Sequence, residues 1–293
     1  MYNIPDFLEY LLYQKRYSTH SITAYKNDLT SFHQFAEMEG FKKIEEINHL
    51  IIRKWLISLM ENGLEARSIN RKISSLKSYY KFLIREGRVQ INPMSKIINP
   101  KMSKKLPEFV EKAQMDNMFD WDNVFDAGFE GIRNRTIILL FYNTGMRLSE
   151  LRGLKKNDID FSNLHLKVLG KRNKERIIPF TIDFKKDLLL YLQSIPADYC
   201  HTEYLFAQRN GKSLYPKLIY NIVNETLAKI TTLRKKSPHV LRHTFATHML
   251  NNGADLNAIK EILGHANLSA TQVYTHNSIE KLKKTYKQAH PKA

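Results

Sequence analysis

The sequence of 293 residues lacks several features that common protein classes require. It has a single cysteine, Cys200, which excludes both an intrachain disulfide and a cysteine-based zinc site. It has no run of about 18 apolar residues, the length that a membrane-spanning helix needs. Near the N-terminus, acidic Asp6 and Glu9 stand where a signal peptide would have lysine or arginine. These absences favour a soluble protein of a reducing cytosol.

Acidic residues are scarce relative to basic ones. The chain has 46 Lys and Arg against 29 Asp and Glu, which gives a formal net charge of +17. A surplus of this size indicates a polyanionic partner, with nucleic acid first and an anionic membrane surface second. Residues 1–105 carry 18 basic and 10 acidic residues and residues 106–293 carry 28 and 19, so both parts could face the same polyanion.

The first hundred residues show the apolar periodicity of a helical bundle. We expect an apolar helical stripe over 7–12 and helices over about 18–39, 49–61 and 68–87, with Ser18 and Ser68 as N-caps. The segment 100–107 has proline at both ends and includes Lys104 and Lys105, which is typical of a linker that could follow a phosphate backbone. The predicted domains are therefore 1–99 and 108–293, joined by this linker.

The second part of the chain mixes helices with a short hairpin. Strands are expected over 165–169 and 176–180 around a turn at 170–174. Helices are expected over 133–143, 183–194, 216–230, 239–251, 255–263 and 278–289. The predicted fold is mainly α, with a helical-bundle N-terminal domain and an α+β second domain that has a small antiparallel sheet.

Several side chains of the second part suit phosphodiester transfer without a metal. Arginines on separate elements, such as Arg147 and Arg242, could bind the non-bridging oxygens of a phosphate. A lysine on a turn, Lys171, could protonate a leaving oxygen, and a tyrosine could be the covalent nucleophile. Each also has a plainer interpretation, as a surface arginine, a solvated lysine or a packed tyrosine. Glu150 could form a helix-surface ion pair with Arg147 or orient it.

The histidines of the segment 239–248 allow a second interpretation. His239 and His243 have the i, i+4 spacing of a zinc pair, with His248 as the nearest third ligand. A zinc hydrolase of that type would have glutamate where Val240 stands, and no carboxylate follows at a suitable place. A shared phosphate for His239 and Arg242 fits the residue types better, which leaves His243 and His248 to pack within the domain.

The ordered set of motifs resembles the tyrosine recombinases, or phage integrase family, and most closely their bacterial Xer type. The resemblance rests on Arg147 in TGMRLSEL, His239 and Arg242 in PHVLRHTFATH, His265 in ILGHANLSATQVYTH, and Tyr274 nine residues later. It covers nearly the whole chain. No single motif is decisive, but the complete set in this order is specific.

The resemblance implies a role for each of these residues. Arg147 and Arg242 would clamp the scissile phosphate, His239 and His265 would bind it and assist proton transfer, and Lys171 would be the general acid. Tyr274 would attack and form a 3′-phosphotyrosyl link, with no cofactor, metal or ATP. Similar proteins often have glycine after the lysine, where this chain has Arg172, so Lys174 stays open as an alternative acid.

The resemblance also implies partners. The first is double-stranded DNA with a specific recombination site. Four subunits would assemble on two such sites, either as a homo-tetramer or as a hetero-tetramer with a paralogous recombinase. A septal DNA translocase is a further implied partner, and no membrane is involved. The helix at 278–289 would dock on a neighbouring subunit. In the N-terminal domain, the candidate DNA contacts are Arg67, Arg71, Lys72 and Lys77.

The expected biological role is Xer-like chromosome dimer resolution in the cytoplasm, at the nucleoid. The alternative within the same chemistry is an integrase or transposase of a mobile element. A type IB topoisomerase uses a similar set of residues, but the spacing and the N-terminal domain favour a recombinase. Outside this chemistry, the alternatives are a DNA-binding accessory protein with a dead site and a metal-dependent nuclease.

Overall fold

The chain forms two compact units, residues 1–105 and 106–293. The computed structural model of the protein describes residues 4–102, 108–117, 124–170, 174–199, 202–264 and 276–291, with no side chains for 276–281. The division between the units falls inside the segment 100–107. Each unit has a hydrophobic core of its own.

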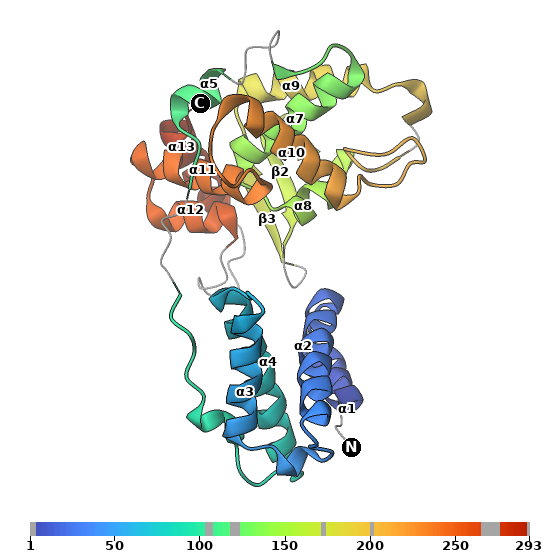
Figure 1. Ribbon diagram of the computed structural model, residues 1–293. Helices are drawn as coiled ribbons and strands as arrows, with labels where there is room; N and C mark the ends of the chain where they lie inside the picture. The colour runs from blue at the N-terminus through green and yellow to red at the C-terminus, as the bar shows by residue number, and fades with distance from the viewer. Residues whose placement is uncertain are drawn as a thin grey trace. The chain divides into compact units, whose positions relative to one another are not determined.

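Unit 1 is a bundle of helices (Figure 1). Its elements are α1 (Ile4–Glu9) with a π-helical turn (Tyr10–Gln14), α2 (Thr19–Met38), α3 (His49–Glu61) and α4 (Ala66–Arg85), with 3₁₀ turns at Ile44–Glu46 and Pro93–Lys96. Ser18 caps α2 as predicted, and its hydroxyl accepts from the backbone N–H of Ser21 at 3.3 Å. The predicted cap at Ser68 is wrong, because α4 begins two residues earlier with Glu65 at the N-cap position.

The core of unit 1 contains the apolar faces that the sequence predicts. On α4 the inward residues are at most 1% exposed: Ile69, Ile73, Leu76, Tyr80 and Leu83. A buried charge also joins the helices, since Asp28 of α2 is 1% exposed. Its carboxylate pairs with Arg71 and with Lys72, whose Nζ lies 3.2 Å from Oδ1, and accepts from the Ser75 hydroxyl at 2.8 Å.

Unit 2 combines helices with a three-stranded antiparallel sheet, which confirms the predicted fold class. Its elements are α5 (Lys112–Asn117), α7 (Phe129–Thr144), α8 (Leu148–Gly153), β1 (Ile159–Asp160), β2 (His165–Leu169), β3 (Glu175–Pro179), α9 (Ile182–Ser194), α10 (Pro216–Ile230), α11 (Pro238–Asn251), α12 (Leu256–Leu263) and α13 (His276–Ala289). Proline stands at the first position of α10 and α11, where the N–H that it lacks would have no partner within the helix.

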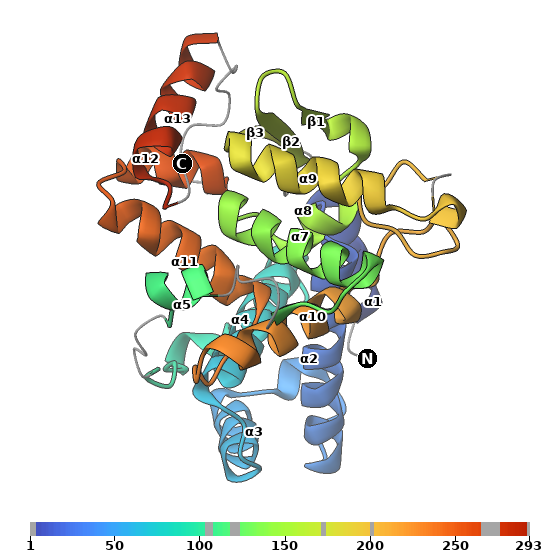
Figure 2. The same ribbon diagram turned by 90° about the horizontal axis from the view of Figure 1, so that it is seen from above.

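The sheet has the order β1-β2-β3 and lies near α9 (Figure 2). The predicted hairpin is confirmed by the β2–β3 register, in which Val168 pairs with Arg176 and Leu169 with Glu175. The second strand begins one residue before the predicted start. The short strand β1 was not predicted, because it is too short to show an alternation of apolar and polar residues. Residues 171–173 of the turn lie outside the described residues.

Helix α7 is the centre of unit 2, because every residue from Thr136 to Thr144 is buried. It packs against α9 and α11. The C-terminal helix α13 packs on its own unit in this single chain, where Tyr286 is 2% exposed and donates to the Asn143 carbonyl oxygen at 2.7 Å. The structure contains one chain, so the expected docking of this helix on a neighbouring subunit stays a prediction. Across the described ranges, no helix has the length and apolar character to cross a membrane.

The Asp28 cluster yields a prediction for the stability of unit 1. Replacing Asp28 by alanine leaves Lys72, which is 9% exposed, without its carboxylate partner. Because an unpaired buried charge is strongly destabilising, we expect the free energy of unfolding to fall by about 3 kcal/mol. Urea unfolding followed by Trp55 fluorescence in a Trp121→Phe background measures this.

The matched control for that experiment is a second Asp–Arg pair of the same unit. Asp6 and Arg88 are 3.0 Å apart, with side chains 50% and 37% exposed. Asp6→Ala should reduce stability by less than about 1 kcal/mol, because exposed ion pairs contribute little. Equal losses in the two variants would show that burial does not set the strength of the Asp28 pair.

Candidate active site

Arg147 reaches the surface through a tight turn after α7. Gly145 ends that helix in the left-handed conformation, with φ +57°, and its N–H donates to the Phe141 carbonyl oxygen at 2.9 Å. A Cβ at this position would lie 2.5 Å from Cδ1 of Phe245. Both the backbone angle and the neighbouring ring therefore require glycine, and the turn places Arg147 at the N-cap of α8.

Glu150 connects Arg147 to a second arginine. It is 5% exposed, and its Oε1 accepts from Nη1 of Arg147 at 2.8 Å while its Oε2 accepts from the Arg147 backbone N–H at 2.7 Å. From β3, Arg176 donates to the same two oxygens at 2.7 and 2.8 Å. Glu150 is thus a buried hub between two guanidinium groups, and the alternative of a helix-surface ion pair does not apply.

The surroundings of Glu150 hold it ionised. Burial by itself would raise the pKa of this carboxyl group. The hydrogen bonds and charge of Arg176, followed by the hydrogen bonds from Arg147, outweigh that effect and lower the pKa to about 2. The carboxylate is therefore charged at any physiological pH.

Arg242 of α11 completes the cationic cluster. Its Nη1 donates to the Gly145 carbonyl oxygen at 2.6 Å and its Nη2 to the Leu263 carbonyl oxygen at 2.7 Å. Burial, and then the positive charges of Arg147 and Arg176, lower the pKa of Arg242 to about 10, so it stays charged at neutral pH. Arg147 and Arg176 share the Glu150 carboxylate and Arg242 binds backbone carbonyl groups, so the cluster as a whole has two more positive charges than negative ones.

The three guanidinium groups meet at the C-terminal end of α12. The carbonyl oxygens of Ile262, Leu263 and Gly264 accept from Arg176 at 2.7 Å, Arg242 at 2.7 Å and Arg147 at 3.2 Å, respectively. A helix C-terminus has unpaired carbonyl groups and a partial negative charge, so it suits cations. The end of this helix therefore fixes the spacing of the arginines.

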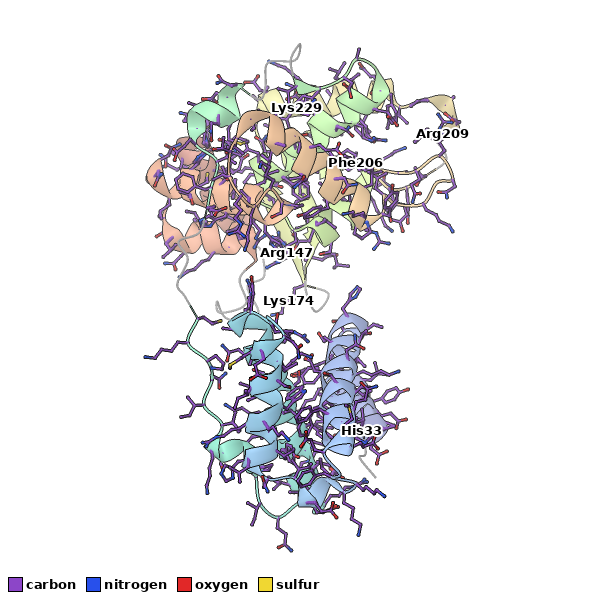
Figure 3. All side chains as sticks on the ribbon, in the orientation of Figure 1. His33, Arg147, Lys174, Phe206, Arg209 and Lys229 are labelled. Atoms are coloured by element: carbon purple, nitrogen blue, oxygen red, sulfur yellow. The ribbon has the colours of Figure 1, made fainter. Side chains whose placement is uncertain are left out.

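A pocket of about 180 Å³ brings three of the predicted residues together. Arg147, His239 and Arg242 line it, and Tyr220 of α10 forms part of its wall. His239 is exposed at the first turn of α11. Figure 3 shows Arg147 on the same side of unit 2 as Lys174, which follows the hairpin turn. The pocket offers nitrogen donors from Arg147 at the start of α8 and from two side chains of α11.

Five predicted site residues lie outside the described residues. They are Lys171, His265 and Tyr274 of the proposed reaction centre and Lys104 and Lys105 of the predicted linker. In the sequence, β3 begins at Glu175, four residues after Lys171, and α12 ends at Leu263, two residues before His265.

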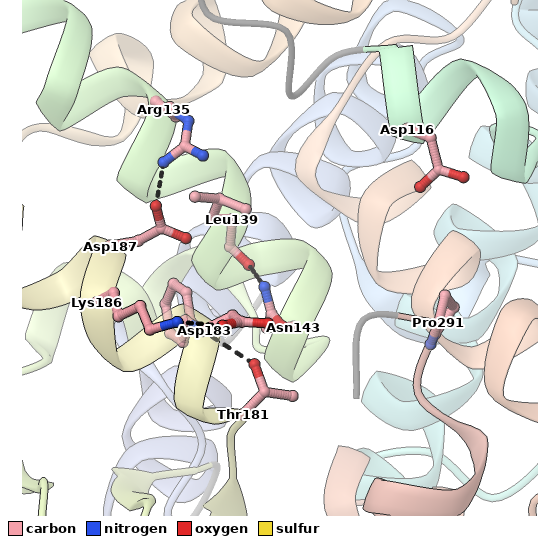
Figure 4. Close-up of a pocket in the computed structure, with 10 residues that line it drawn as sticks. Asp116, Arg135, Leu139, Asn143, Thr181, Asp183, Lys186, Asp187 and Pro291 are labelled. Atoms are coloured by element: carbon pink, nitrogen blue, oxygen red, sulfur yellow. Dashed lines mark hydrogen bonds and ion pairs between the residues drawn. The ribbon is translucent and has the colours of Figure 1, made fainter.

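A larger pocket, of about 590 Å³, lies elsewhere in unit 2 (Figure 4). Four of its charged side chains form two ion pairs, Arg135 with Asp187 and Lys186 with Asp183. None of the predicted site residues lines it. The smaller pocket, where cationic groups exceed anionic ones, is therefore the candidate active site.

The remaining histidines of α11 pack within unit 2. His248 is 5% exposed and its Nδ1 lies 2.9 Å from the Tyr142 hydroxyl oxygen. The His243 ring lies against Phe109, with ring centroids 6.5 Å apart. Within the part of the chain that the structure describes, no three His, Cys, Asp or Glu side chains gather closely enough to hold a metal ion.

The four basic residues predicted to contact DNA from α4 have different surroundings. Arg67, Arg71 and Lys77 are exposed, although Arg71 pairs with Asp28 and the Lys77 Nζ donates to Asn99 at 3.0 Å. Lys72 is buried in its pair with Asp28, with its Nζ 5.7 Å from the centroid of the Trp55 ring. This burial argues for a structural role of Lys72 in place of a DNA contact.

Arg176 is the site residue that the sequence analysis missed. It is 4% exposed and stands on the inner face of β3 together with Ile178. A signal was available in the sequence, because Arg176 is a charged residue at an inward position of an alternating strand. A buried charge at such a position needs a partner.

Comparisons with known proteins identify the family. Residues 108–281 match the phage integrase family and residues 4–87 match the phage integrase N-terminal SAM-like domain. The tyrosine recombinase XerC of Anoxybacillus flavithermus is 39% identical over 292 residues, which covers 98% of this chain and 97% of the relative. XerC of Bacillus subtilis is 37% identical over 293 residues, with coverage of 98% and 95%. The chain therefore belongs to the phage integrase family, the tyrosine recombinases, and is a site-specific recombinase similar to the Xer proteins.

Solved structures share the fold. A XerH site-specific recombinase bound to a palindromic difH substrate, in a post-cleavage complex, has a TM-score of 0.73 at 22% identity, covering 93% of this chain and 77% of that one. A lambda integrase fragment bound as a dimer to a core site has a TM-score of 0.70 at 16% identity, covering 92% and 98%.

The lowered pKa of Glu150 predicts a specific acid sensitivity. A carboxyl group with a lowered folded-state pKa stabilises the fold above its ordinary value of 4.5, and this contribution is lost as the pH falls towards 2. Glu150→Gln should therefore be less stable than the wild type by about 3 kcal/mol at pH 7, and the gap should narrow between pH 4.5 and 2. Urea unfolding followed by circular dichroism at several pH values measures the gap.

The control is Glu175→Gln in the same hairpin. The Glu175 side chain is 57% exposed and lies 3.2 Å from Lys167, so its replacement should change stability little at any pH. A Glu150→Gln deficit that stays constant from pH 7 to pH 2 would contradict the role of its charge.

Proposed function

We propose that this recombinase cleaves and rejoins duplex DNA at specific sites through a 3′-phosphotyrosyl intermediate. The observation that carries the proposal is the pocket that Arg147, His239 and Arg242 line, with an excess of positive charge and with its arginines fixed by Glu150 and by the end of α12. A phosphodiester has the charge and the oxygen acceptors that such a pocket lacks.

In the proposed reaction, the two arginines bind the non-bridging oxygens and stabilise the charge that develops on them. The Tyr274 hydroxyl oxygen attacks phosphorus, so that a tyrosyl–phosphate bond forms and the bond to the 5′-oxygen breaks. Lys171 delivers the proton that the 5′-oxygen needs, and His239 and His265 bind the phosphate and help to remove the tyrosine proton. Rejoining runs the same steps backwards with a new 5′-hydroxyl.

This chemistry requires no ATP, because each bond that forms is a phosphodiester like the bond that breaks. The net charge of +17 would serve mainly to hold the duplex, through contacts that weaken as salt rises. Arg67, Arg71 and Lys77 of unit 1, with Lys104 and Lys105 of the segment between the units, are the proposed phosphate contacts. Such contacts position a protein on DNA and carry no sequence information themselves.

The proposed assembly is a tetramer on two DNA sites, made of this chain alone or with a paralogous recombinase. In it, α13 would leave its own unit and dock on a neighbour. The proposed role is chromosome dimer resolution at the nucleoid, in cooperation with a septal DNA translocase. Support for a Xer role comes from relatives that are named XerC and cover nearly the whole chain. A mobile-element integrase is the less favoured alternative.

The first test of the mechanism is formation of a covalent protein–DNA complex. With a nicked suicide site, the wild type should form a complex that survives a denaturing gel, and it should do so in EDTA. Tyr274→Phe should form none, because it lacks the attacking oxygen. The protein's own site can be obtained by sequencing genomic fragments that the wild type traps.

Two results would contradict this mechanism. A covalent complex with Tyr274→Phe would mean that another residue is the nucleophile. Complete loss of activity in EDTA would return the metal-dependent nuclease to consideration. Phenylalanine at position 274 is the matched control, since it keeps the ring and removes only the hydroxyl group.

The second test concerns the clamp. Arg242→Lys keeps the positive charge, but one ammonium group cannot replace a planar guanidinium that reaches two carbonyl groups and a phosphate. We expect DNA affinity within a few-fold of the wild type and cleavage lower by a factor of about 10²–10³. Gel-shift titrations and single-turnover cleavage measure the two quantities. Equal losses of DNA affinity and of cleavage rate would show that Arg242 is a general DNA-binding residue.

A further inference from the structure

Arg176 is a buried cation whose hydrogen-bonding nitrogens all have partners. Two of them make the bidentate pair with Glu150 at 2.7 and 2.8 Å, and Nε donates to the Ile262 carbonyl oxygen at 2.7 Å. A guanidinium group that is 4% exposed would be unstable in this position without such partners. Its place is therefore set by α8 and α12 together, although it belongs to β3.

Arg176 does not line the phosphate pocket, whereas Arg147 and Arg242 do. Its effect on a bound phosphate has to pass through another group. That group is Glu150, because both carboxylate oxygens are shared between Arg176 and Arg147. Arg176 therefore fixes the plane and position of the carboxylate against which Arg147 is aligned.

The sharing also changes the charge that Arg147 can offer. A Glu150–Arg147 pair alone would be neutral overall. With Arg176 on the same carboxylate, the group of three side chains has a net charge of +1, so the outward face of Arg147 remains attractive to an anion. A buried arginine behind the carboxylate thus maintains the positive potential of the pocket without occupying it.

The neighbourhood of Arg176 has little room for adjustment. Gly264, in the left-handed conformation with φ +66°, lies so close that a Cβ there would be 3.1 Å from Cδ of Arg176. The strand pairing Val168–Arg176 fixes the base of the hairpin, and the Gly170 N–H donates to the Lys174 carbonyl oxygen at 2.7 Å. Close contacts on both sides hold the guanidinium group in one position.

We propose that Arg176 is a positioning residue of the recombinase. It acts through Glu150 to hold Arg147 in the geometry that cleavage requires, and it keeps the net charge of the three side chains positive. The inference rests on the proposed function, in which Arg147 binds the scissile phosphate. It predicts a defect in the chemical step and not in DNA binding, since the proposed duplex contacts lie on other residues.

The test uses Arg176→Gln and Arg176→Lys in the full-length protein on the trapped DNA site. For both, we expect DNA affinity within a few-fold of the wild type and single-turnover cleavage reduced at least tenfold, with the larger loss for glutamine. If the glutamine variant does not fold, the lysine variant decides. Wild-type cleavage by a folded Arg176→Lys variant would overturn the proposal.

Two further measurements separate positioning from a merely structural role. Because Arg176 acts through Glu150, the double variant Glu150→Gln/Arg176→Gln should cleave about as fast as Glu150→Gln alone, and full multiplicative loss would overturn the proposal. A 5′-bridging phosphorothiolate substrate, whose sulfur leaves without a proton, should not restore cleavage by Arg176→Lys. Restored cleavage would overturn the proposal, because it would show that Arg176 supports the general acid of the hairpin turn and does not act through Glu150.

The matched control is a buried arginine of the same unit that does not contact Glu150. Arg133 of α7 is 6% exposed and bonds to Asn134 through Nε at 3.2 Å. Arg133→Lys should keep the cleavage rate of bound complexes, and a loss equal to that of Arg176→Lys would reduce both to general stability effects. Absence of a covalent complex with the wild type would instead refute the proposed function, and this inference with it.

Discussion

The active-site side of unit 2 depends on one buried carboxylate. Glu150 accepts hydrogen bonds from the backbone and side chain of Arg147 and from two nitrogens of Arg176, all between 2.7 and 2.8 Å. The first of these bonds begins α8, the second orients an arginine of the pocket, and the last two attach the sheet. Loss of this one negative charge would leave two adjacent guanidinium groups in repulsion, one of them buried.

The second constraint is the carboxyl end of α12. Three consecutive carbonyl groups, those of Ile262, Leu263 and Gly264, each accept from a different arginine. Elements that are far apart in the sequence therefore meet at one helix end. In the sequence, His265 follows this helix end directly, after Gly264.

Local patterns predicted most of the helices, and distant partners explain what they could not predict. The bounds of α3 and β2 match the expectation, because a capping residue, a stop signal or an alternating run defines each of them locally.

Arg176 was missed because its partners lie 26 and 86 residues away. The burial of Lys72, a predicted DNA contact, depends in the same way on a distant partner, since Asp28 is 44 residues away. Arg147, His239 and Arg242, which were grouped by residue type, line one pocket. The roles of Lys171, His265 and Tyr274 stay predictions.

The arrangement also explains how a cationic cluster can stay folded before DNA binds. Three guanidinium groups with one carboxylate would repel one another, and the lowered pKa of Arg242 reflects its burial first and this repulsion next. The carbonyl groups at the end of α12 offset part of this repulsion. They carry partial negative charges, which stabilise the guanidinium groups without neutralising them. Arg147 and Arg242 still line the pocket. A phosphodiester bound there would meet donors that are already oriented, because folding and not the reaction supplies the energy of orienting them.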